Sequence, residues 1–281
     1  MAIKEKNGNI NGSIGNEVYR TVKGRTIVQS RPAYVTQTIA SRRAASEFAL
    51  VSTTAGALRK SMSAIYDGYD PEMITRMTAA VRRSFSGCSN KAVLERDLHD
   101  GDLSPFLGFQ FNNRSPLNKI LKVRPSITID EDGHVDFLLP VIDHRQHLMY
   151  RRSLAQFQVT LRLSLFAFNF RKEYYISYPS AAAELRISGE SPIHFRLEPL
   201  IPDGVTLFAC VSLHYYTEDS LSGRKNVNSK EWSPAEIMAA RHFREGNTDA
   251  ESAESLMKDT LPGYKGNSIL KECGVLAPSL I

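Results

Sequence analysis

Alternating apolar and polar residues dominate the middle of the chain and predict a β-rich region. The segment 157–170 alternates strictly from Phe157 to Leu165, which is the period of a half-buried strand. Shorter runs with strand character, separated by turn residues, lie at 106–112, 126–140, 174–178, 183–188, 193–199 and 204–216. Antiparallel strands at this spacing are typical of a β-sandwich. We therefore predict an α+β, mainly β fold with an immunoglobulin-like antiparallel β-sandwich over residues 103–217.

Other segments have the period of an amphipathic helix. Apolar residues recur every three or four positions within 38–62 and again within 70–85, where Asp70-Pro71 is typical of a helix start. We expect a helical segment over 36–102, in which 91–98 forms a third, shorter helix. In the C-terminal segment 218–281, Ser233-Pro234 with Glu236 resembles a capping box. This pattern predicts a helix to about residue 244, followed by an extended tail with a short helix at 250–258.

The N-terminal arm, residues 1–35, contains a β-hairpin pattern. Strand-forming runs near 17–22 and 25–30 flank Lys23-Gly24, in which glycine supplies the positive φ of a tight turn, and Pro32 ends the second strand. The preceding residues 7–16 are rich in Gly and Asn, and we expect a turn-laden, extended entry there. Because an isolated hairpin is marginally stable in water, this one must lean on the rest of the chain or on another copy.

The positive charge of the protein is concentrated in the same region. Residues 1–43 hold eight lysines and arginines against Glu5 and Glu17, whereas the remaining chain is almost neutral. Such a segment suits nucleic acid or an acidic patch on a neighbouring subunit. It also suits a solvated hairpin whose charges prevent edge-to-edge aggregation. All three interpretations remain open at this level.

The remaining composition limits the class of protein. No apolar run is long enough to cross a bilayer, and the first residues lack the apolar stretch of a secretory signal. Cys88, Cys210 and Cys273 are an odd number without metal-site spacing. We expect synthesis in the cytoplasm, no membrane insertion and no cofactor.

Motifs that carry chemistry are scarce. The chain has no phosphate loop and no nucleophile elbow. Residues 130–136 mimic part of a calcium loop, but Val141 stands where a bidentate glutamate is required, so a hairpin turn is the favoured interpretation. Asp143, His144 and His147 lack a fourth ligand and are interpreted as a polar loop. His99 and His242 have no partner pattern. We predict no catalytic residue and no metal site.

One resemblance adds to this picture. Gly12, Gly15, Asn16, Val18, Lys23, Gly24, Val28, Arg31, Pro32, Arg43 and Phe48 carry it. This N-terminal region resembles that of an uncharacterised family from Bacteroidota, in which a similar turn, hairpin and helix precede a β-rich remainder. Glu17 and Tyr19 depart from the hydrophobic pattern of that turn. The family has no established activity, so the resemblance implies no catalytic residues.

These observations favour a non-enzymatic structural protein that assembles with copies of itself by arm exchange. The setting we expect is a phage-type virion or tail, or a filament, with other particle subunits as further partners. The arm residues expected to fill pockets on a neighbour are Tyr19, Val22, Gly24, Ile27, Val28 and Pro32. The basic residues expected to contact acids or nucleic acid are Arg20, Lys23, Arg25, Arg31, Arg42 and Arg43. The alternative is a nucleic-acid-binding protein that uses the same basic arm.

Overall fold

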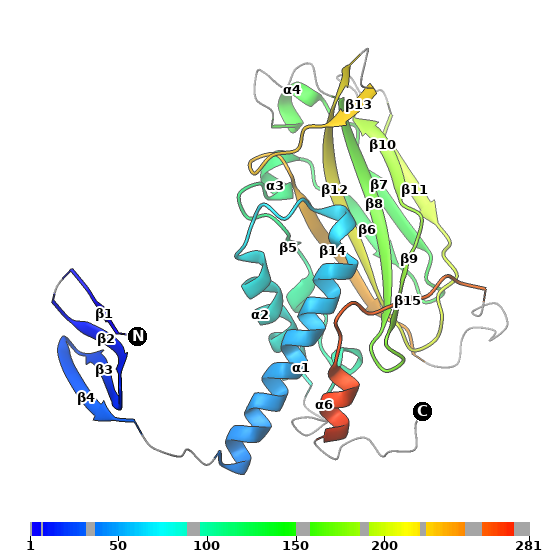
Figure 1. Ribbon diagram of the computed structural model, residues 1–281. Helices are drawn as coiled ribbons and strands as arrows, with labels where there is room; N and C mark the ends of the chain where they lie inside the picture. The colour runs from blue at the N-terminus through cyan, green and yellow to red at the C-terminus, as the bar shows by residue number, and fades with distance from the viewer. Residues whose placement is uncertain are drawn as a thin grey trace. The chain divides into compact units, whose positions relative to one another are not determined.

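The chain divides into two compact units in a computed structural model, an N-terminal unit (Met1–Arg42) and a C-terminal unit (Arg43–Ile281) (Figure 1). The structure describes residues 2–6, 8–31, 37–88, 96–149, 158–185, 191–219, 223–244 and 255–272.

The described strands of the N-terminal unit form one antiparallel sheet in sequence order. They are β1 (Ile3–Lys4), β2 (Ile10–Ile14), β3 (Glu17–Val22) and β4 (Arg25–Ser30). The predicted hairpin is confirmed as β3 and β4. Lys23 and Gly24 have φ values of 48° and 78°, so both turn residues adopt the left-handed conformation that a type I′ hairpin turn requires. Within the extended entry expected over 7–16, residues Ile10–Ile14 form strand β2, whose residues 12–14 pair with β3.

Both long predicted helices are confirmed. They are α1 (Ile39–Ser61) and α2 (Met73–Ser86), with the short 3₁₀ turn η1 (Ser63–Ile65) between them. Ahead of α2, the Asp70 carboxylate accepts a hydrogen bond from the backbone N–H of Glu72 at 3.0 Å, which satisfies a donor at the helix start. The apolar stripe of α1 is buried from Leu50 onward.

A large antiparallel sheet occupies the centre of the C-terminal unit. Its described strands follow the order β15-β9-β8-β12-β14-β5, with β10 beside β8 and β13 beside β12. Their bounds are β5 (Phe109–Gln110), β8 (Gln158–Asn169), β9 (Tyr174–Ser177), β10 (Ala181–Leu185), β12 (Thr206–Asp219), β13 (Gly223–Asn226), β14 (Ala235–His242) and β15 (Asp259–Thr260).

A second, smaller sheet has the order β11-β7-β6, with β6 (Ser126–Ile129), β7 (Val135–Leu139) and β11 (Ile193–Leu197). The predicted hairpin over 126–140 is confirmed, with Ile127 opposite Phe137. Short helical turns complete the described elements: η2 (Leu98–Asp100), η3 (Ser104–Phe106), α3 (Leu117–Ile120), α4 (His144–His147) and α6 (Gly266–Glu272).

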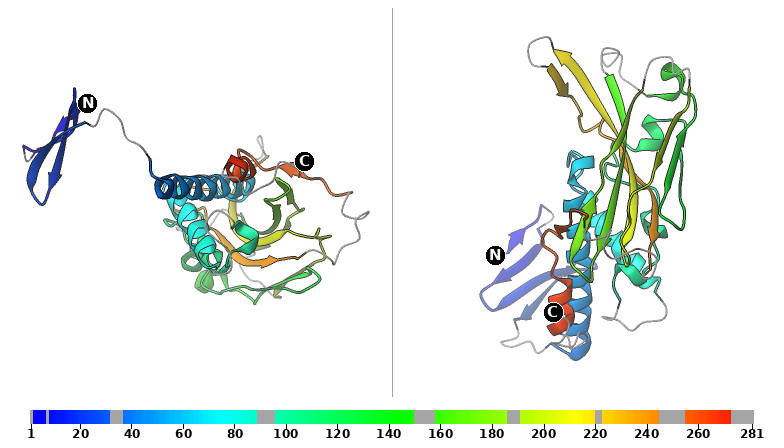
Figure 2. Two further views of the ribbon diagram at one scale, coloured as in Figure 1. Left: turned by 90° about the horizontal axis from the view of Figure 1, so that it is seen from below. Right: turned by 90° about the vertical axis from the view of Figure 1, so that its right-hand side faces the viewer.

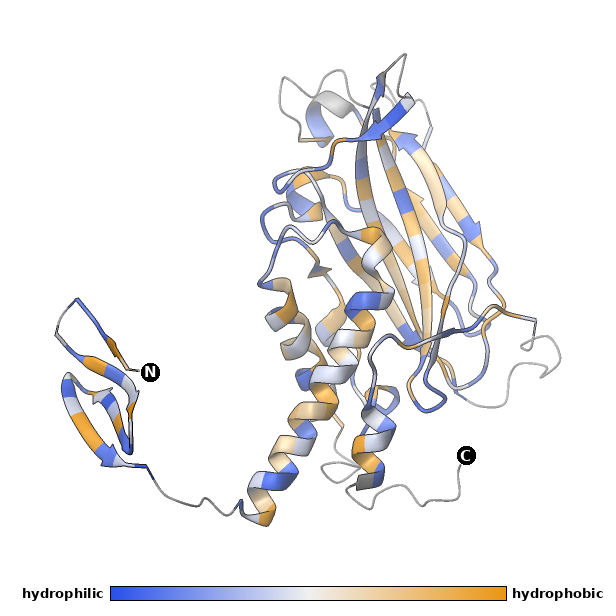
Figure 3. Cartoon of the chain, in the orientation of Figure 1, coloured by the Kyte–Doolittle hydropathy of each residue, from blue (hydrophilic) through white to orange (hydrophobic). Residues whose placement is uncertain are grey.

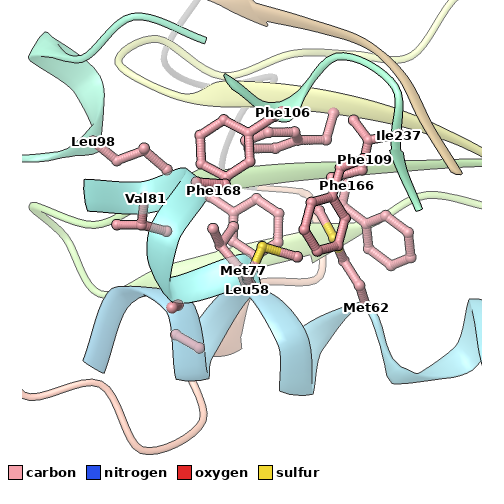
Figure 4. Close-up of a cluster of buried hydrophobic side chains, with 14 of the residues drawn as sticks. Leu58, Met62, Met77, Val81, Leu98, Phe106, Phe109, Phe166, Phe168 and Ile237 are labelled. Atoms are coloured by element: carbon pink, nitrogen blue, oxygen red, sulfur yellow. The ribbon is translucent and has the colours of Figure 1, made fainter. Parts of the chain in front are cut away.

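The large sheet is covered on both faces. Helices α1 and α2 lie against one face and the small sheet lies against the other (Figure 2). Phe166 and Phe168 of β8 pack with Leu58 and Met77 on the helix side (Figure 4), whereas Leu163 faces the small sheet. The half-buried strand predicted over Phe157 to Leu165 is confirmed only in part, because Thr160 and Ser164 on its polar side are also buried. The structure confirms a mainly β α+β fold with two facing antiparallel sheets, but it does not confirm an immunoglobulin-like sandwich.

The predicted C-terminal helix over 233–244 is wrong, because this segment is strand β14. Ala235, Glu236 and Ile237 are consecutive and all buried, which a strand between two covered faces allows. The expected cap residue Ser233 instead donates its hydroxyl to the Asp67 carboxylate at 2.5 Å. Pairing with β12 therefore outweighs the local helix signals of this segment.

The expectations for shorter segments have mixed outcomes. In 106–112 only Phe109–Gln110 is strand, since Phe106 ends the turn η3. Most of the expected helix at 91–98 lies outside the described residues, as does the first part of the one at 250–258, and described residues 255–258 are not helical. Helix α6 was not predicted.

Candidate assembly surface

Strand β4 is an edge strand of the N-terminal sheet, and all six of its residues are exposed. The two-residue turn makes Val22 and Arg25 a hydrogen-bonded pair, so the backbone groups of residues 25, 27 and 29 point toward β3. By the same alternation, the N–H and C=O groups of Thr26, Val28 and Ser30 point away from the sheet. This edge therefore offers three residues of unpaired backbone to another strand.

The centre of this edge carries no charge. Residues 26–30, TIVQS, are β-branched or polar, and the flanking charges are Arg25 and Arg31. Native sheets usually protect exposed edges with charged residues, prolines or very short strands. The opposite edge has such protection, because β1 is two residues long and includes Lys4. Strand β4 is protected only at its ends.

The predicted arm residues divide between the two faces of the sheet. Tyr19 lies opposite Val28, so both share one face, and Val22 and Ile27 lie on the other. The exposed fractions are 47% for Val22, 40% for Ile27 and 50% for Val28. Hydrophobic bands therefore mark the strands of this unit (Figure 3). Gly24 serves the turn, and Pro32 lies outside the described residues.

Four of the six predicted basic residues lie on or beside the β3–β4 hairpin, and none of the four pairs with a described acidic residue. Arg20 and Arg25 share the face of Val22, Lys23 occupies the turn, and Arg31 follows β4. The structure shows no ion pair for these side chains with any described residue; Arg42 and Arg43 lie in the first turns of α1 and also have none. The arm thus presents uncompensated positive charge beside an open strand edge.

Sequence reasoning missed the support that β2 gives to the hairpin. The Asn11 side chain accepts a hydrogen bond from the Thr21 N–H at 2.8 Å and donates to Glu5 at 2.7 Å. This contact satisfies a β3 donor on the side away from β4. The signal was the alternation of residues 10–14, INGSI, which its Gly and Asn content obscured.

Acidic residues of the C-terminal unit gather at one end of the small sheet. Glu131 and Asp132 in the β6–β7 turn, with Glu198 after β11 and Asp203, line a cavity of about 730 Å³. The same cavity includes Arg241 and Arg244. Because β6 and β11 are the edge strands of this sheet, both of its described edges lead into acidic residues.

Four of the residues weighed as metal ligands take part in local hydrogen bonds. Asp130 accepts a hydrogen bond from the His134 N–H and contacts His134 Nδ1, both at 2.8 Å. This contact raises the pKa of His134 and lowers that of Asp130. Asp130, Asp132 and His134 could offer ligand atoms within 4.8 Å of one another, but their hydrogen bonds fit a tight hairpin turn. In the second motif, His147 Nδ1 accepts from the Asp143 N–H at 3.0 Å.

Residues that the sequence left without partners meet elsewhere in the C-terminal unit. His99 and His242 both contact the Thr206 hydroxyl, and both line a cavity that Cys88 also lines. Cys210 lies in the core, where burial raises the pKa of its thiol. The sequence separation of the two histidines hid this arrangement.

No protein-family model matches the chain, and neither a curated protein nor a solved structure is similar to it. Among the described residues, no helix has the length and apolar character needed to cross a membrane.

Proposed function

We propose that this protein is a non-enzymatic structural subunit that assembles with copies of itself through the N-terminal sheet. The observation that carries this proposal is the exposed, centrally uncharged edge of β4. Strand addition to such an edge supplies main-chain hydrogen bonds, and alternate side chains supply specificity. Tyr19 and Val28 on one face, with Val22 and Ile27 on the other, give the added strand apolar surface to cover.

The charges at the ends of β4 argue against pairing between two β4 strands. A two-fold antiparallel pair centred on Val28 places Thr26 opposite Ser30 of the second copy. The same register places Arg25 opposite Arg31 twice, and like charges directly opposite are destabilising. The positive charge of the whole arm adds to this repulsion.

An acidic acceptor removes this conflict. The small sheet has two edge strands that lead into Glu131, Asp132 and Glu198, so its acidic end on a neighbouring copy fits both the strand edge and the charge of the arm. Donor and acceptor are then different surfaces, and such head-to-tail contacts build rings or filaments. A virion, a tail or a filament is the kind of particle that this geometry serves.

The test compares the assembly state of the full-length protein with that of a variant that lacks one of the β4 backbone N–H groups that point away from β3. Val28→Pro removes an N–H that points away from β3, a position where an edge strand tolerates proline. Mass photometry and negative-stain microscopy should show oligomers for the native chain and monomers for this variant. A native protein that remains a monomer at micromolar concentration contradicts the proposal.

Ile27→Pro is the matched control. Its N–H points toward β3, so this variant should lose the N-terminal sheet itself, which circular dichroism detects. Oligomers that persist in Val28→Pro also contradict strand addition at this edge. Absorbance at 260 and 280 nm of the oligomers shows whether nucleic acid is retained, which is the result expected if the basic arm instead serves nucleic-acid binding.

A further inference from the structure

Three adjacent strand ends and one loop meet at a cavity of about 640 Å³ in the C-terminal unit. The strand ends belong to β8, β12 and β14, and the loop is formed by residues 97–102, which include η2 (the 97–102 loop). Cys88, at the end of α2, lines the same cavity and is buried. Nothing in the proposed assembly function uses this region.

A continuous chain of hydrogen bonds joins these elements. The Phe170 N–H donates to His99 Nε2 at 2.9 Å, and His99 Nδ1 lies 3.2 Å from the Thr206 hydroxyl. The same hydroxyl lies 2.9 Å from His242 Nδ1, and His242 Nε2 lies 2.9 Å from the Gly101 carbonyl.

With both imidazoles neutral, the two ends of this chain fix the direction of every bond. A backbone N–H only donates, so His99 Nε2 must accept and His99 Nδ1 must carry the proton. A carbonyl only accepts, so His242 Nε2 must donate, and Nδ1 of a neutral His242 accepts. The Thr206 hydroxyl then accepts from His99 and donates to His242. The bond from the Phe170 N–H forms only when His99 is neutral, because His99 Nε2 must keep its lone pair.

The surroundings keep both imidazoles neutral near pH 7. Burial lowers the pKa of His99 to about 4 and lowers the pKa of His242. Nearby charges act in both directions, since Asp97 raises and Arg171 lowers the pKa of His99. The charged and titratable groups around the two rings are Cys88, Asp97, Asp100, Asp102, Arg171, Lys172 and Arg244.

The 97–102 loop covers the end of α2. The Asp102 N–H donates to the Ser84 carbonyl at 3.2 Å, and a Cβ on Gly101 would lie 2.3 Å from Ser84 Oγ. Arg171 holds the same loop through Asp97 at 2.6 Å and Asp100 at 3.2 Å. The loop is therefore fixed by the histidine chain on one side and by ion pairs on the other.

We propose that the 97–102 loop is an acid-released latch over the cavity at the end of α2. A proton from solvent on His99 Nε2 places two donors face to face, His99 Nε2–H and the Phe170 N–H, and breaks the first bond of the chain. The loop then separates from the strand ends and opens the cavity beside Cys88, while the remaining core stays folded.

Thiol labelling of the full-length Cys273→Ser variant tests this latch. Its remaining cysteines are Cys88 beside the cavity and Cys210 in the core. With 4,4′-dithiodipyridine, corrected for its rate with free cysteine, Cys88 should react about tenfold faster at pH 4.5 than at pH 7 because of local opening. Cys210 should stay protected at both pH values. Equal rates for Cys88 at the two pH values, or labelling of Cys88 only together with Cys210, overturn the proposal.

Thr206 provides a matched pair of variants. Thr206→Val keeps the side-chain shape but removes the central hydroxyl, so Cys88 should already react fast at pH 7. Thr206→Ser keeps the hydroxyl and should behave as the parent. If both variants behave as the parent, the histidine chain does not hold the loop. Nitrogen-15 NMR of the unmodified protein gives an independent check, since it should show the proton on Nδ1 of His99 and on Nε2 of His242 at pH 7.

Discussion

Arg25 and Arg31 flank the free edge of β4, and they decide which kind of strand can pair with it. Arg25→Glu therefore separates the two modes of assembly. In a two-fold β4 pair, the new glutamate lies opposite Arg31 and association should strengthen. On an acidic acceptor, the same change should weaken association a few-fold, since each cross-strand charge pair contributes about 0.2–1 kcal/mol.

We expect weakening, measured as the oligomer fraction against protein concentration. Arg20→Glu is the matched control, because it makes the same change of charge on β3, away from the free edge. Its effect should be smaller than that of Arg25→Glu. Stronger association of Arg25→Glu than of the native chain contradicts the head-to-tail arrangement.

Buried histidines make the stability of the C-terminal unit depend on pH. Burial lowers the pKa of His99 and of His214 to about 4 from 6.5. Well above pH 6.5 neither the folded nor the unfolded chain binds these two protons, so the contribution of His99 and His214 to stability is constant. Between pH 6.5 and about 4 the unfolded chain binds them preferentially, and the free energy of unfolding falls by up to about 1.4 kcal/mol per pH unit for each histidine.

Urea unfolding at pH 7, 6 and 5, followed by the fluorescence of Trp232, measures this slope. His214→Gln should reduce the slope, because it removes one of the groups that carry it. His194→Gln is the matched control for the substitution itself, since the His194 side chain is 57% exposed. A free energy of unfolding that is flat from pH 7 to pH 5 contradicts the expectation.

At the scale of elements, the β14 strand depends on a buried carboxylate. Glu236 is fully buried, accepts a hydrogen bond from Gln110 at 2.6 Å and pairs with Arg124. Arg124→Leu leaves this carboxylate buried without its cation and should lower the free energy of unfolding by about 3 kcal/mol. Lys122→Leu removes an exposed charge from the same loop and should have little effect; equal losses for the two variants in urea unfolding contradict this role of Arg124.

Elements that short sequence motifs specify could be predicted from the sequence. Elements that depend on pairing with a distant strand could not. The hairpin of β3 and β4 follows from Lys23-Gly24, and α2 from Asp70 and its apolar stripe. The capping signals at Ser233 and Glu236 were misleading, because both side chains bond to distant residues instead. The burial of both faces of β8 was hidden too, since alternation shows one apolar face and cannot show what covers the other.

At the scale of the whole molecule, charge separates assembly from nucleic-acid binding. If arm exchange onto an acidic neighbour holds the particle, added salt should weaken it moderately, because main-chain and apolar contacts remain. If the arm binds nucleic acid, affinity should fall steeply with salt, by a slope that reports the phosphates neutralised. Mass photometry at several salt concentrations, with absorbance at 260 nm, distinguishes assembly by arm exchange from nucleic-acid binding. We expect particles that contain no nucleic acid and persist at high salt.

The sequence by itself determined the mainly β character, the two long helices, the hairpin and the concentration of positive charge in the first residues. Each of these depends on the period or composition of a short segment, which local chemistry controls. Only the tertiary structure decided which strands are neighbours, that β14 is a strand, and that His99 meets His242 on Thr206. These features depend on contacts between residues far apart in the chain, where pairing and burial outweigh local propensity.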